Sequence, residues 1–199
     1  MAEQTPPPLP GGFTPPPPLP RRAGLGMRAL AFLMDGLLVF FFTLFLLIKI
    51  LLPQNHAEGM RDMVQTVDSY AAAVQEAQRN GEPTPPAPEP AEDSPMVQML
   101  AYSWQIMIIT FWVYFGLVEA LCKGTSLGKR TFGLRAIKIQ TGQPASPFEY
   151  ALRGGIKTLT LLFPLPLPML LWVNYLIPFF NGNRRAGHDF LCRTVVIAE

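Results

Sequence analysis

The hydrophobic residues of this chain fall into three long blocks, separated by polar stretches. The first block, residues 29–52, is almost entirely apolar, and the second covers residues 99–122. About 20 apolar residues cross a hydrocarbon core of roughly 30 Å, so each block predicts a transmembrane helix. The third block, residues 156–180, contains several prolines: Pro164, Pro166, Pro168 and Pro178. Because a regular helix does not accommodate this pattern, the block predicts either a kinked span or a re-entrant hairpin of two half-helices.

Two of the polar stretches are rich in proline. Residues 1–20 repeat a Pro-Pro-Pro-Leu-Pro motif, which predicts a disordered or polyproline-II tail. Residues 53–98 carry two basic residues against eight acidic ones. Within that stretch, residues 60–80 have the apolar spacing of a weakly amphipathic helix, and the prolines of 82–95 exclude a helix or central strand. We therefore predict a flexible loop that contains one helix.

Composition agrees with a membrane protein. Of the 199 residues, 49% are hydrophobic and only 15% are charged, which indicates an integral membrane protein with small soluble parts. The first apolar block is too long for the core of a signal peptide, so we interpret it as an uncleaved anchor. Two cysteines, Cys122 and Cys192, make no disulfide framework, and we expect both to be unpaired.

The distribution of basic residues predicts the orientation. Arginines precede the first block, and lysines and arginines fill residues 123–157, so we expect both regions in the cytoplasm and the acidic residues 53–98 outside. A re-entrant third block would also keep the basic C-terminal tail inside, whereas a full third crossing would place it outside. Only the hairpin lets the predicted strands 134–140 and 194–197 pair. The expected fold is an all-α membrane protein with a short cytoplasmic β pair and a helix that begins at Pro147.

Charged residues inside the apolar blocks are the first candidates for function. Asp35 follows Arg28 by seven positions, about 10 Å along a helix and on the same face. Glu119 lies near the end of the second block, which an antiparallel arrangement places on the same side of the membrane as Arg28. Since a carboxylate at this depth costs at least ~2.5 kcal/mol, we expect Asp35 to face Arg28, Glu119 or the third block rather than lipid.

A glycine-rich basic turn follows the second block. The pair Gly128-Lys129 suggests a phosphate-binding loop, but three residues rather than four separate Gly124 from Gly128, and an arginine follows the lysine. We instead expect Lys129, Arg130 and Arg135 to form a basic turn at the membrane surface, each gaining about 1 kcal/mol from anionic lipid.

Asp189 offers two interpretations. As a structural group it would cap or pair with the basic turn around Lys129 and Arg130. As half of a His188-Asp189 catalytic pair it lacks a matching nucleophile motif. The histidines and cysteines lie on different segments, so we expect no catalytic residues, no metal site and no cofactor.

Several of these features together resemble the RDD family of bacterial membrane proteins. They are Arg28 before the first span, Asp35 inside it, residues 124–139, Arg153 and the terminal residues 188–197. The one arginine and two aspartates of the family name map onto Arg28, Asp35 and Asp189. The resemblance covers residues 22–198 apart from the long 53–98 loop. It implies a multi-span inner-membrane protein that is often linked to transport, without a substrate.

Two functions remain open. In the first, the protein is a transporter or transporter component for an ion or small solute. Its polar network would be Arg28, Asp35, Glu119 and Asp189, and so few helices would require an oligomer. In the second, it is a membrane scaffold or assembly factor that holds protein partners. The expected partners are the bilayer with its anionic lipid, copies of the chain or other membrane proteins, and no nucleic acid.

Overall fold

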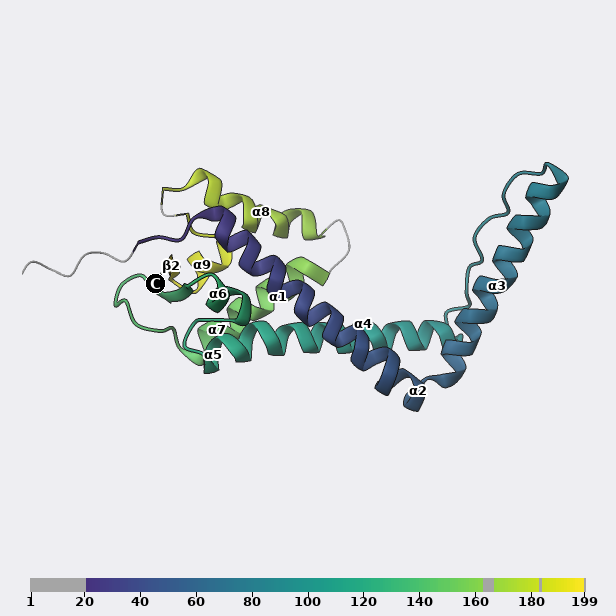
Figure 1. The fold of residues 1–199 in the computed structure, drawn as a ribbon, viewed down its shortest axis with the longest axis horizontal. Helices are drawn as coiled ribbons and strands as arrows, with labels where there is room; N and C mark the ends of the chain where they lie inside the picture. The colour runs from purple at the N-terminus through teal and green to yellow at the C-terminus, as the bar shows by residue number, and fades with distance from the viewer. Residues whose placement is uncertain (1–20, 163–166, 183, 199) are drawn as a thin grey trace, which may run out of the picture.

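Two long, mostly apolar helical segments, called the two rods below, run through the molecule (Figure 1). The computed structural model describes residues 21–162, 167–182 and 184–198. The first rod consists of α1 (Leu25–Leu46), a π-helical stretch η1 (Leu47–Leu51) and α2 (Leu52–Asn55). The second consists of α4 (Pro95–Val113), a π-helical stretch η2 (Tyr114–Val118) and α5 (Glu119–Leu121). Both rods are long and apolar enough to cross a membrane.

The rods carry apolar side chains on their exposed surface as well as on the side that packs against the rest of the protein. On α1, Leu33 is 57% exposed, Phe41 61% and Phe45 59%. A helix in the core of a soluble protein would bury such side chains, and a continuous apolar surface of this extent indicates contact with another apolar phase. The two predicted spans therefore have the character of membrane helices.

A third helix, α3 (Ala57–Asn80), projects beyond the far end of the rods (Figure 1). It confirms the helix predicted over residues 60–80. Gly81 ends it in the left-handed conformation, at φ 71°, after which the proline-rich residues return along α3 without regular structure. Tyr70 donates a hydrogen bond to the carbonyl of Pro85 at 3.2 Å and so ties the return to the helix.

The predicted strand pair is also confirmed. Strands β1 (Leu134–Lys138) and β2 (Thr194–Ala198) are antiparallel, in a register that runs from Leu134 opposite Ala198 to Lys138 opposite Thr194. Arg22 adds a bridge to Ile197 and brings the start of the described chain to the same place.

The third hydrophobic block is divided between two helices. The first, α7 (Pro147–Leu162), begins at the predicted proline, and the second is α8 (Leu167–Phe180). Residues 163–166, which include two of the prolines, lie outside the described residues. Figure 1 shows α8 running back toward the end of the molecule that holds the sheet. Two short helices complete this end, α6 (Leu127–Thr131) and α9 (Gly187–Leu191).

A glycine contact fixes how α7 crosses the second rod. A Cβ atom on Gly154 would lie 2.5 Å from the backbone nitrogen of Gly116, so the two backbones touch. Small residues at such crossings let membrane helices approach closely. The close approach places Arg153 and Lys157 of α7 beside Glu119 of the second rod.

Candidate functional site

Glu119 is the centre of a buried cluster of charges. Its side chain is 0% exposed, and three cations surround it. Arg153 Nη1 donates to Oε2 at 3.0 Å, Lys129 Nζ lies 2.8 Å from Oε1, and Lys157 Nζ also bonds Oε1. An unpaired carboxylate in this position would be very costly, and the three cations from α6 and α7 compensate it.

Asp189 is the second buried carboxylate, also 0% exposed. Arg153 Nη2 donates to its Oδ1 at 2.6 Å, and Arg28 Nη2 donates to its Oδ2 at 2.5 Å. The backbone N–H of Ala186 donates to Oδ2 at 3.1 Å. Arg153 of α7 therefore bridges Glu119 of α5 and Asp189 of α9, and Asp189 extends the link to Arg28 of α1.

These contacts correct two expectations. Asp189 pairs with Arg28 and Arg153 rather than with Lys129 or Arg130, because the β1–β2 pairing holds α9 over the start of α1. The direct Glu119–Arg28 contact considered from the sequence is replaced by a link through Arg153 and Asp189. Three of the four predicted network residues, Arg28, Glu119 and Asp189, are nevertheless joined, because Arg153 connects the last two.

Asp35 lies apart from these pairs. It is 2% exposed, and its hydrogen bonds come from neutral donors: Tyr114 Oη at 2.6 Å, Ser126 Oγ at 2.5 Å and the Gly128 backbone N–H at 2.7 Å. The sequence predicted that Asp35 would face Arg28, Glu119 or the third block. In the structure its hydrogen-bond partners are Tyr114, Ser126 and Gly128 instead. The reason is the docking of α6 on α1, which a side chain at Gly128 would prevent, since its Cβ would lie 2.2 Å from the Ala31 carbonyl oxygen.

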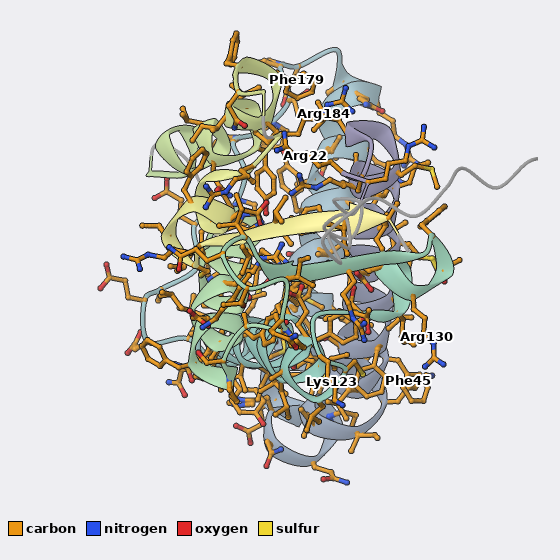
Figure 2. All side chains as sticks on the ribbon, turned by 90° about the vertical axis from the view of Figure 1, so that its left-hand side faces the viewer. Arg22, Phe45, Lys123, Arg130, Phe179 and Arg184 are labelled. Atoms are coloured by element: carbon orange, nitrogen blue, oxygen red, sulfur yellow. The ribbon has the colours of Figure 1, made fainter. Side chains whose placement is uncertain are left out.

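The basic turn is only partly a surface feature. The Lys129 side chain is 9% exposed and faces Glu119, so its expected place at the membrane surface is wrong. Burial lowers the pKa of the Lys129 ammonium, and the charge of Glu119 opposes that shift. Arg130 is exposed and Arg135 is half-buried. Viewed from this end, Figure 2 shows Arg130 and three other basic residues around the sheet: Arg22, Lys123 and Arg184.

His188 is a buried neutral group. Asn174 accepts from the His188 backbone N–H at Oδ1, 2.6 Å away, which turns its Nδ2 toward His188 Nδ1 at 3.1 Å. The ring nitrogen Nδ1 therefore accepts, and Nε2 carries the proton toward Asp189 Oδ1 at 3.5 Å. Burial lowers the pKa of His188 to about 3. The His188 ring therefore links α8 to α9, and its Nε2 faces the Asp189 carboxylate.

A cavity of about 520 Å³ adjoins the cluster, between α1, α7 and α8. Its polar end is formed by charged side chains, namely Arg28, Asp35, Lys129, Arg153 and Lys157. Its walls are apolar or aromatic and include Phe32, Leu33, Leu161, Leu176 and Phe179. The Phe32 and Tyr175 rings, with centroids 5.3 Å apart, connect α1 to α8 across it.

The role of Lys157 and the position of Arg153 in the network were not predicted from the sequence. A signal was present, because the two residues are four apart in a helix predicted from Pro147 and therefore share a face. Within the described parts of the chain, no group of three histidine, cysteine or acidic side chains could hold a metal ion.

The fold and the cluster define a helical membrane protein whose helices are joined by buried ion pairs. The sequence model of the RDD family matches residues 22–193, and the chain belongs to that family. This confirms the resemblance seen in the sequence. No curated protein and no solved structure matches the chain.

Proposed function

We propose that the protein is a component of a transport system for an ion or small solute in the bacterial inner membrane. The cavity between α1, α7 and α8 supports this proposal most directly, because its polar end is a cluster of buried charges. Ionisable groups at membrane depth commonly mark solute or proton paths. The protein acts as a carrier without catalytic chemistry, and it works as an oligomer because two rods and a helical hairpin make a thin wall around a solute.

In the proposed topology, the end that holds the sheet faces the cytoplasm and α3 lies outside. Basic residues gather around the sheet, whereas the α3 loop is acidic. The helices α7 and α8 enter the membrane from the cytoplasmic side and return to it. The pairing of β1 with β2 supports this arrangement, because it requires both strands on one side.

Flux measurements in proteoliposomes test the transport proposal. Charge movement on a solid-supported membrane is recorded after jumps of sodium chloride, potassium chloride, sodium acetate and sodium dodecyl phosphate, and proton movement with an enclosed pH-sensitive dye. We expect at least one signal that is absent from empty liposomes and reduced in Lys157→Met. Correctly folded protein that gives none of these signals in any oligomeric state would contradict the proposal.

The projecting α3 supports a second candidate function, that of a membrane scaffold. Its Val64 is 54% exposed and its Val67 60%, on a helix that packs against α4 only at its start and then projects beyond the rods. Such a surface suits a protein partner on the outer side. Replacing residues 57–94 by a short Gly/Ser linker would abolish partner capture by cross-linking if the scaffold is the function, and would leave flux intact if transport is.

A further inference from the structure

We propose that the cavity binds one anionic amphiphile, with its acidic head at the charged end and its aliphatic chain along the apolar walls. The proposal deepens the transport function above and rests on it for its biological role, but not for the binding itself. It assigns a substrate class, a single-chain carboxylate or phosphate ester, to a cavity between α1, α7 and α8.

The charges at the polar end favour an anion. Four buried or nearly buried cations meet there, Arg28, Lys129, Arg153 and Lys157, all of which line the cavity. Three carboxylates oppose them, Asp35, Glu119 and Asp189. The group therefore has one more basic side chain than carboxylates, and a buried ammonium or guanidinium without a carboxylate of its own is costly unless an anion accompanies it.

The cation set also has an unused hydrogen-bond donor. Arg153 is 1% exposed, its Nη atoms bond Glu119 and Asp189, and its Nε–H makes no hydrogen bond. Tyr175 also lines the cavity, and its Oη lies close to Thr160 but makes no hydrogen bond of normal geometry. Buried donors of this kind are normally satisfied, so both groups are suited to a polar head.

The walls and the volume favour a chain behind that head. Phe32, Leu161 and Leu176 line the cavity, and Leu176 is 53% exposed, so the apolar wall continues to the outer surface of the helices. A molecule in the bilayer could enter sideways between α1 and α8. A volume of about 520 Å³ falls within the range of roughly 300–1,000 Å³ that is typical of ligand pockets and suits one chain.

Native mass spectrometry of the delipidated, detergent-solubilised protein tests the proposal. Oleate is compared with oleyl alcohol, and dodecyl phosphate with dodecanol, so that each pair differs only in the acidic head. We expect one bound molecule per chain, and each acid to bind at least tenfold more tightly than its alcohol. The preferred acid then distinguishes a carboxylate source from a phosphate source.

Three variants locate the binding site. Lys157→Met should reduce the preference for oleate over oleyl alcohol to less than threefold, while Glu119 keeps Lys129 and Arg153 as partners. Leu161→Trp and Leu176→Trp add bulk to two walls of the cavity and leave every charged side chain of the cluster in place, and both should weaken oleate binding at least tenfold. Leu117→Trp, at a position that is 52% exposed and does not line the cavity, should bind as the wild type does.

Equal binding of the acid and the alcohol in both pairs would overturn the assignment of an anion. Unchanged binding in both tryptophan variants would overturn the location. If oleate binds as predicted but the proteoliposomes show no flux, the transport function fails and this site stands. If flux is present but oleate neither binds nor competes with it, the substrate class fails and the transport function stands.

Discussion

Arg28 and Asp189 form an ion pair, with Nη2 and Oδ2 2.5 Å apart, although 161 residues separate them in the chain. The pair connects the first turns of α1 to the short helix α9. Asp189 holds Arg153 on its other oxygen, so the first rod is linked through two arginines to Glu119 in the second rod. Arg28 and Asp189 thus help to fix the helices to each other beside a cavity.

Asp189→Asn should destabilise the protein strongly. The change leaves Arg28 and Arg153 with a neutral partner, and breaking a buried ion pair from one side costs about 3–5 kcal/mol. The thermal unfolding midpoint of the purified protein in detergent, followed by circular dichroism, measures the effect. Glu149→Gln is the matched control, since its pair with Lys138 is partly exposed at 3.0 Å and should contribute less than about 1 kcal/mol. Equal midpoints for the two variants would contradict this account of the cluster.

Gly154→Ala and Gly155→Ala should have opposite effects. At Gly154 the new Cβ would lie 2.5 Å from the Gly116 nitrogen, so the helices must separate, at a cost of about 1–3 kcal/mol. At Gly155 the nearest atom is Trp112 Nε1 at 3.4 Å, and alanine gains up to about 1 kcal/mol in helix propensity. Unfolding midpoints of both variants check the prediction, and a Gly154→Ala midpoint at or above that of wild type would refute it.

Local pattern predicted most of the fold. The length of the apolar blocks indicated the two rods, Pro147 indicated the start of α7, and strand composition around Leu134 and Thr194 indicated the two strands. Each of these features depends on residues that are close together in sequence.

The partners of the charged residues could not be predicted in this way. Lys129 points inward because Ser126 caps α6 and α6 docks on α1 at Gly128, a contact that no periodicity encodes. Asp35 meets Tyr114 as a result of the same docking. Depth in the membrane limited each carboxylate to a polar environment, but the choice among several available donors depended on tertiary packing.

Stability should fall as the pH is lowered below neutrality. The folded protein keeps His188 neutral down to about pH 3, since burial lowers its pKa from an ordinary 6.5. Unfolding in that window takes up a proton, which costs the native state about 1.4 kcal/mol per pH unit. The pKa of Asp189 is also lowered, chiefly by Arg153 acting against burial, so protonation of the unfolded carboxylate adds to the loss at the acidic end.

The variant His188→Gln separates the contribution of His188 to the pH dependence of stability from that of Asp189. Glutamine can accept from Asn174 but does not titrate, so its midpoint should change less between pH 7 and pH 5 than that of wild type. Thermal unfolding at half-unit pH intervals measures the difference. Parallel curves for the two proteins would show that His188 is not the titrating group.

Asp35→Asn should fold and Asp35→Leu should not. The three donors around Asp35 need acceptors, and Asn keeps one carbonyl oxygen while the Ser126 hydroxyl can turn to accept from the new amide. We expect Asn to cost about 1–3 kcal/mol and Leu more, because Leu leaves all three donors unpaired. Abundance in membranes and flux are measured together. If Asn retains both abundance and flux, Asp35 serves adhesion between helices, and if it retains abundance alone, its charge takes part in transport.

The proposed topology predicts which cysteines an impermeant maleimide reaches in intact cells. Cys122 is exposed at the end of the second rod and Cys192 is buried, and both are free thiols, so wild type offers one natural site. Cys122 should stay unlabelled until the membrane is permeabilised.

In a Cys122→Ser background, Thr84→Cys in the acidic loop should label from outside and Glu199→Cys should not. Labelling at position 199 from outside would exclude the re-entrant hairpin and establish three crossings. Labelling of Cys122 in intact cells would invert the orientation and place the basic end outside, against the charge asymmetry from which the topology was inferred.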